Sequence, residues 1–116
     1  MRLLLSLAVS ALVPTAAFAE YATIQNQSDF VTLVAGKTLS RPFVKLEVSP
    51  EGEIKGKGAA WEVEGKWIWQ DGFFCRDLFW GGDALGYNCQ KVEVSDSYVR
   101  FTSDKGKGDS AEFRLK

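Results

Sequence analysis

Apolar and polar residues alternate with a period of two from Phe43 almost to the end of the chain. Val44, Leu46 and Val48, for example, are separated by Lys45 and Glu47, a pattern typical of a strand with one buried face. The pattern predicts strands over 43–48, 53–58, 60–63, 66–70, 73–76, 87–94, 98–102 and 111–115. Short connections make neighbouring strands antiparallel. We therefore expect a mainly β fold, an up-and-down meander of seven or eight strands that closes into a small barrel.

Turn residues separate these segments, and Asp71-Gly72 is the strongest hairpin signal among them. Glu64-Gly65 is interpreted as another turn, as are 49–52, 95–97 and the polar stretch 103–108. A two-residue turn at Asp71-Gly72 places Gln70 opposite Phe73. One face of this hairpin then carries Ile68, Phe73 and Cys75, extended by Trp61 and Val63, and the other carries Trp67, Trp69, Phe74 and Arg76.

Both faces of the hairpin are apolar, so something must cover the second one. A short N-terminal helix over 28–35 is a candidate, with Ser28 as its N-cap and Gly36 as its stop. The alternative is that the second face is part of a binding surface. Under either interpretation, Arg76 could lie over Trp67 in a cation–π contact.

The first nineteen residues have the features of a secretory signal peptide. Arg2 is followed by an apolar run over 3–13, and Ala17-Phe18-Ala19 fits a cleavage site. The run is too short for stable membrane insertion. A single exported β-domain over 20–116, periplasmic or secreted, would keep all 15 acidic and 13 of the 14 basic residues, a formal charge of −2. This charge argues against nucleic acid as a partner.

The only two cysteines, Cys75 and Cys89, predict a disulfide in an exported protein. They fasten the segment 77–83, which contains Phe79 and Trp80. These two aromatic residues either fold back and plug one end of the barrel or stay exposed and insert into a partner. A fastened loop loses less entropy on binding.

Histidine is absent, so neither a Ser-His-Asp triad nor a histidine-containing zinc site can form. Asp71, Asp77 and Asp83 are the nearest carboxylates for a hydrolase, yet each lies where aspartate is favoured by turn chemistry. We therefore predict no catalytic residue, no metal and no cofactor.

Three stretches carry a resemblance to known proteins: RPFVKLEVSPEGEIKGKGAAW (41–61), GKWIWQDGFFCRDLFWGGDALGYNCQ (65–90) and RFTSDKGKGDSAEF (100–113). Together they resemble a group of short exported alphaproteobacterial proteins, some of which carry the label dihydrodipicolinate reductase. Such a reductase resembles a two-domain NAD(P)H enzyme with a G-x-G-x-x-G loop between a strand and a helix. Gly56 and Gly58 lack the third glycine, because position 61 is Trp, and no crossover helix follows. Reductase activity is therefore not expected.

The sequence favours an exported, non-catalytic and monomeric binding module whose partner is an unknown envelope protein or a small ligand. The candidate binding residues are the aromatic face and the fastened segment, namely Trp67, Trp69, Phe74, Arg76, Phe79 and Trp80. One alternative is a small-ligand carrier with a calycin-like lumen. Another, by analogy of architecture alone, is an inhibitor of an envelope enzyme.

Overall fold

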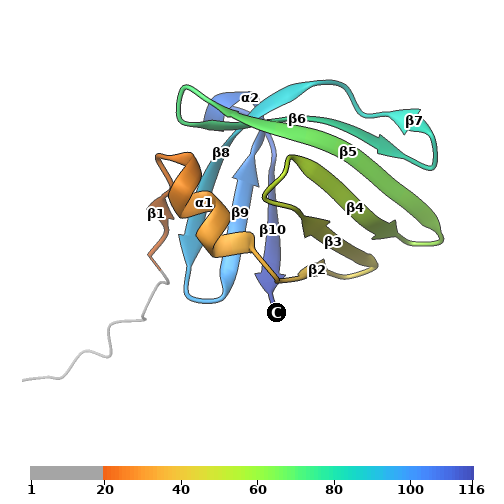
Figure 1. Cartoon of the computed structure of the whole chain (residues 1–116), viewed down its shortest axis with the longest axis horizontal. Coiled ribbons are helices and arrows are strands. Elements are labelled where there is room, and N and C mark those ends of the chain that lie inside the picture. The colour runs from red at the N-terminus through yellow and green to blue at the C-terminus, as the bar shows by residue number, and fades with distance from the viewer. Residues whose placement is uncertain (1–19) are drawn as a thin grey trace, which may run out of the picture.

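The computed structural model describes residues 20–116, so the predicted signal peptide and its cleavage site lie outside the described residues. Ten strands and two short helices follow one another along this part of the chain (Figure 1). The elements are β1 (Ala22–Thr23), α1 (Gln27–Val34), β2 (Leu39–Arg41), β3 (Val44–Val48), β4 (Glu53–Gly58), β5 (Trp61–Gln70), β6 (Phe73–Trp80), β7 (Asp83–Ala84), β8 (Asn88–Ser95), β9 (Tyr98–Thr102), α2 (Ser103–Gly106) and β10 (Ser110–Leu115).

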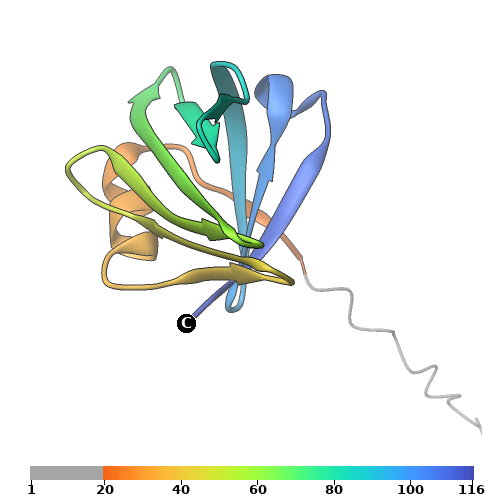
Figure 2. The same cartoon turned by 90° about the vertical axis from the view of Figure 1, so that its right-hand side faces the viewer.

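Eight of the strands form a closed antiparallel barrel, which confirms the predicted fold class. From β2 to β6 each strand pairs with the next, β6 pairs with β8, and β8, β9 and β10 follow in order. The ladder between β10 and β2 then closes the circle, as the end-on view in Figure 2 shows. The two remaining strands are short additions, β1 beside β8 and β7 beside β6.

The hairpin at Asp71-Gly72 has the predicted register. Gln70 lies opposite Phe73 and Trp69 lies opposite Phe74. Asp71 and Gly72 both have positive φ, 53° and 82°, which is the conformation that a two-residue turn of this kind requires. Sequence alone was therefore sufficient to align these two strands.

The predicted turn at Glu64-Gly65 is wrong, because β5 runs without interruption from Trp61 to Gln70. Gly65 lies opposite Leu78, and a Cβ on Gly65 would come within 2.9 Å of the Leu78 side chain. The glycine thus permits a close approach of two strands, which is a common reason for glycine inside a strand. Because alternation continues through Gly65, Trp61 and Val63 share a face with Trp67, and not with Ile68 as predicted.

Helix α1 begins one residue earlier than expected. Asn26 is its N-cap, because its side-chain oxygen accepts a hydrogen bond from the Asp29 backbone N–H at 2.9 Å. Phe30 is completely buried, and the centroids of four aromatic rings lie 5.0–6.3 Å from its own ring, namely those of Trp67, Trp69, Phe74 and Phe101. The helix therefore covers the second aromatic face and closes one end of the barrel.

The barrel has an apolar inside, and most of the outward side chains of β3, β4 and β5 are charged. Trp67, Phe74 and Phe101 belong to the core. On the outer surface, residues of opposite charge face each other across the ladders, among them Glu47 and Lys55 and also Lys66 and Asp77. Such pairs on a solvated face suit an antiparallel sheet in contact with water.

The predicted disulfide between Cys75 and Cys89 is confirmed. The two residues lie directly opposite each other in the ladder between β6 and β8. The disulfide therefore reinforces one of the ladders that close the barrel. Within residues 20–116, no helix has the length and apolar character needed to cross a membrane.

Candidate functional site

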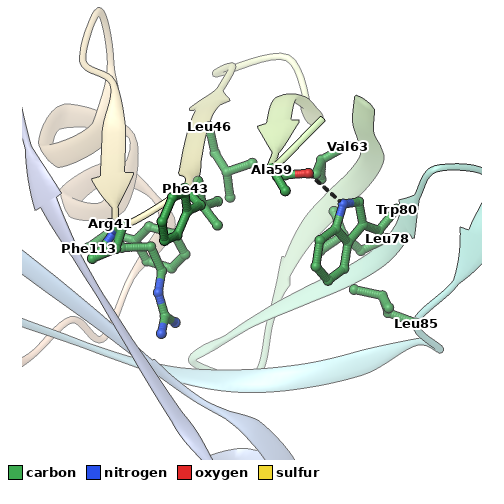
Figure 3. Close-up of a pocket in the computed structure, with 12 residues that line it drawn as sticks. Arg41, Phe43, Leu46, Ala59, Val63, Leu78, Trp80, Leu85 and Phe113 are labelled. Atoms are coloured by element: carbon green, nitrogen blue, oxygen red, sulfur yellow. Dashed lines mark hydrogen bonds between the residues drawn. The ribbon is translucent and has the colours of Figure 1, made fainter. Parts of the chain in front are cut away.

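The end of the barrel away from α1 is open. Three tight turns surround it, Pro42-Phe43 between β2 and β3, Ala59-Ala60 between β4 and β5, and Gly81-Gly82 between β6 and β7. These turns point to the right in Figure 1, whereas α1 lies on the left. Between them is a cavity of about 540 Å³, here called the outer cavity (Figure 3).

The inward-facing side chains of β3, β5, β6 and β10 form most of its wall. They are Val44, Leu46, Val63, Leu78, Trp80 and Phe113, and the turns and strand ends add Arg41, Pro42, Phe43, Gly58, Ala59 and Leu85. A second cavity of about 140 Å³, here called the inner cavity, shares Leu46, Leu78 and Phe113 with the outer one. The two cavities are therefore neighbours inside the barrel, the inner one bordered by core residues such as Phe74 and Phe101, and together they are here called the lumen.

Trp80 is held in the wall of the lumen by strand β4. Its indole N–H donates a hydrogen bond of 2.9 Å to the carbonyl oxygen of Gly58 (Figure 3). A Cβ on Gly58 would lie only 3.0 Å from the same indole nitrogen, so glycine allows the ring to lie against the strand. Gly58 therefore holds the indole ring of Trp80 in one position, as part of the wall at the entrance.

The rim of the open end is apolar and exposed. Phe43 is 86% exposed, and Trp61, Trp80 and Leu85 are also exposed beside the entrance. Phe43 has a φ of 67°, a conformation that a bulky residue rarely adopts. An aromatic side chain that is strained and unburied does not serve the stability of the fold, so the turn is a candidate for contact with a ligand or partner.

Among residues 20–116, the charged residues that line the lumen are Arg41 and Arg76. The Arg41 guanidinium lies 5.7 Å from the centre of the Phe113 ring at the rim. Arg76 lines the inner cavity and donates a hydrogen bond to the carbonyl oxygen of Gly86. Burial lowers the pKa of Arg76, and nearby Asp77 partly offsets this effect. No carboxylate of the described residues lines either cavity.

The structure separates the six residues predicted for binding into three groups. Trp67 and Phe74 are buried, and Trp69 stacks on Phe30 at 5.2 Å between ring centres. These three residues form the closed end of the barrel. Arg76 faces the inner cavity, and its expected cation–π contact with Trp67 is not among those formed by residues 20–116.

Phe79 and Trp80 form the third group, and they lie at the end of β6, which extends four residues beyond its predicted end. Phe79 faces outward opposite Glu64, while Trp80 faces the lumen. Gly81 and Gly82 form the tight turn that follows β6, with φ values of 58° and 87°. Of the six residues predicted for binding, Trp80 is therefore the one that lines the cavity at the open end.

Several lining residues were not predicted as part of a site, notably Arg41, Phe43, Val44, Leu46, Leu78 and Phe113. Leu78 could have been found, because alternation continued past Arg76 places it on the same face as Phe74 and Trp80. The Arg41-Pro42-Phe43 sequence before a strand could have indicated a turn there, since proline is favoured at position i+1 of a turn and Phe43 then occupies position i+2.

The carboxylates considered for hydrolysis do not meet in a cleft. Asp71 and Asp83 are exposed beside different turns, and Asp77 faces outward opposite Lys66. In the part of the chain that the structure describes, no group of three His, Cys, Asp or Glu residues could hold a metal ion.

Comparison with known proteins does not assign this chain to a protein family. No protein-family model, curated protein or solved structure matches the chain. The function must therefore be inferred from the lumen and its rim.

Proposed function

We propose that the protein is an exported, non-catalytic module that binds a small apolar molecule in the open end of its barrel. The observation that carries the proposal is the outer cavity of about 540 Å³, whose wall is formed almost entirely by apolar side chains. This volume lies within the range of about 300–1,000 Å³ that is common for ligand sites. Of the functions considered from the sequence, the small-ligand carrier agrees best with this geometry.

The site is preformed, and Phe30 with the rings around it closes one end of the barrel. Eight paired strands surround the lumen. Each methylene group that a ligand buries contributes about 0.8 kcal/mol. Affinity for a homologous series should therefore rise with chain length until the chain fills the lumen. The disulfide supports export, because such bonds persist in oxidising compartments.

Filling the entrance is expected to weaken the binding of an apolar probe strongly. Val44 lines the outer cavity, so Val44→Trp places a large ring in the lumen, whereas Lys45→Trp places the same ring on the outer face of β3. Binding is measured by titration with 1-N-phenylnaphthylamine, a neutral dye whose emission rises in apolar surroundings. We expect saturable binding by the natural chain and by Lys45→Trp, and a loss of about tenfold or more in affinity for Val44→Trp, equivalent to about 1.4 kcal/mol.

Two results would contradict the proposal. One is an absence of saturable dye binding by the natural, oxidised protein. The other is equal affinity of Val44→Trp and Lys45→Trp, because the dye would then bind outside the lumen. Circular dichroism of both variants establishes that each retains the barrel.

A second candidate function is capture of an envelope protein on the same rim. The strained and exposed Phe43 favours it, since aromatic residues are common anchors of protein interfaces. The two candidates respond differently to Val44→Trp. This substitution fills the lumen and leaves Phe43 in place, so protein capture would survive it and small-molecule binding would not.

A further inference from the structure

We infer that the ligand is an anionic amphiphile, such as a single-chain carboxylate, whose charged group pairs with Arg76 and whose chain extends toward the rim. The inference rests on the proposed function, because it assigns a chemical class to the occupant of the same lumen. It follows from the position of Arg76, from the charges along the lumen, and from the order of side chains on β6.

Arg76 is a half-buried cation with few partners. Its guanidinium makes one hydrogen bond, to the Gly86 carbonyl, and it forms no salt bridge with any carboxylate of residues 20–116. A guanidinium has five N–H donors in a planar fork that matches a carboxylate. A guanidinium that borders an apolar cavity loses hydrogen bonds to water. An anionic ligand would supply hydrogen-bond acceptors in place of that water. The lowered pKa of Arg76 reflects this loss of hydration.

The sign of the charge inside the barrel is opposite to that of the domain. Residues 20–116 carry a formal charge of −2. The lumen, in contrast, is lined by Arg41 and Arg76 and by no described carboxylate. Charge complementarity of this kind selects an anionic ligand over a neutral or cationic one.

The inward side chains of β6 give the ligand its direction. Arg76, Leu78 and Trp80 occupy alternate positions, so they face the lumen in order from the inner cavity to the entrance. Arg76 and Trp80 are four positions apart, which corresponds to about 13 Å along a strand. A carboxylate at Arg76 therefore places its chain beside Leu78 and then beside Trp80.

Arg41 is the weaker candidate for the charged group. It lies at the rim, is exposed to water, and has its guanidinium over the Phe113 ring. A charge in water contributes little to pairing, because solvent screens the interaction. We therefore expect Arg41 to contribute less to anion binding than Arg76.

Calorimetric titration with decanoate and decanol tests the inference, because the two molecules have equal chains and differ in charge. The natural protein is expected to bind decanoate about 10–100-fold more tightly than decanol, the range for hydrogen bonds to a charged group. Arg76→Met should remove this preference, because methionine has no charged group to pair with a carboxylate. Arg76→Lys should retain part of the preference, and Arg41→Met should reduce it less than Arg76→Met.

The outcomes separate this inference from the proposed function. Equal binding of decanoate and decanol by the natural protein overturns the inference and leaves the apolar site intact. Binding of neither molecule overturns both. A larger loss of decanoate affinity in Arg41→Met than in Arg76→Met also overturns the inference, because the anion would then lie at the rim. If Arg76→Met does not fold, the preference of the natural protein and its reduction in Arg76→Lys decide the result.

Discussion

Replacing Phe30 by alanine is expected to lower the free energy of unfolding by about 3–5 kcal/mol. Phe30 is completely buried, and its ring contacts Trp67, Trp69 and Phe74 at the closed end of the barrel. Alanine would leave a cavity among these rings that the rigid strands cannot fill. Urea denaturation followed by far-ultraviolet circular dichroism measures the change.

Thr32→Ala is the matched control for Phe30→Ala. Thr32 lies on the same helix and is exposed, so its substitution should change stability by no more than about 0.5 kcal/mol. Domains of this size are stable by about 5–15 kcal/mol, so the Phe30 variant should lose a large share of its free energy of unfolding. Equal denaturation midpoints for the two variants would contradict the packing of α1 against the barrel.

Removing the disulfide is expected to cost about 3 kcal/mol, the value for a closed loop of about 15 residues. Cys75 and Cys89 are 14 positions apart and lie opposite each other where β6 meets β8. In the double variant Cys75→Ala/Cys89→Ser the unfolded chain is no longer constrained by this bond. In the folded protein, the variant lacks the bond between two strands that close the barrel. Urea denaturation of the variant and of the oxidised natural protein gives the difference.

Reduction of the natural protein with dithiothreitol provides the control for these substitutions, because it breaks the same bond without changing a residue. The reduced protein and the double variant should have similar midpoints. A loss below about 1 kcal/mol in both would show that the disulfide has little effect on the unfolded state, contrary to the chain-entropy estimate.

The fold could be predicted from the sequence wherever local chemistry and alternation agreed. Asp71-Gly72 demands a two-residue turn, and this turn aligned β5 with β6 correctly. Glu64-Gly65 has the same kind of composition and was misread, because glycine also permits a close approach inside a strand. The distinction depends on Leu78, which lies opposite Gly65 when the register set by Asp71-Gly72 is continued through Gly65. The residues beside Gly65 do not by themselves contain that information.

The candidate site was predicted only in part. Alternation shows which face of a strand a residue occupies, but it does not show whether the residue lies near the open or the closed end of the barrel. Trp67 and Trp80 both face the lumen, yet Trp67 lies beneath Phe30 and Trp80 lies at the open end. Which end of a barrel is covered depends on where α1 packs, and this is a tertiary property. Phe43 was missed for a different reason, since its exposure follows from one turn and from no periodic pattern.

The central claim is that an apolar molecule enters the lumen past Trp80, and contact quenching by bromine tests it most directly. The protein has four tryptophans, and Trp61 lies 6.3 Å from Trp80 between ring centres. A Trp61→Phe background therefore leaves Trp80 as the tryptophan at the entrance, while Trp67 and Trp69 remain at the closed end. Titration with bromodecanol, a neutral chain with a bromine atom, is followed by tryptophan emission. The lumen predicts saturable quenching that disappears in Trp61→Phe/Trp80→Phe and persists in the control Trp61→Phe/Trp69→Phe. Quenching that is unchanged when Trp80 is replaced, or that never saturates, would contradict entry of the ligand into the lumen.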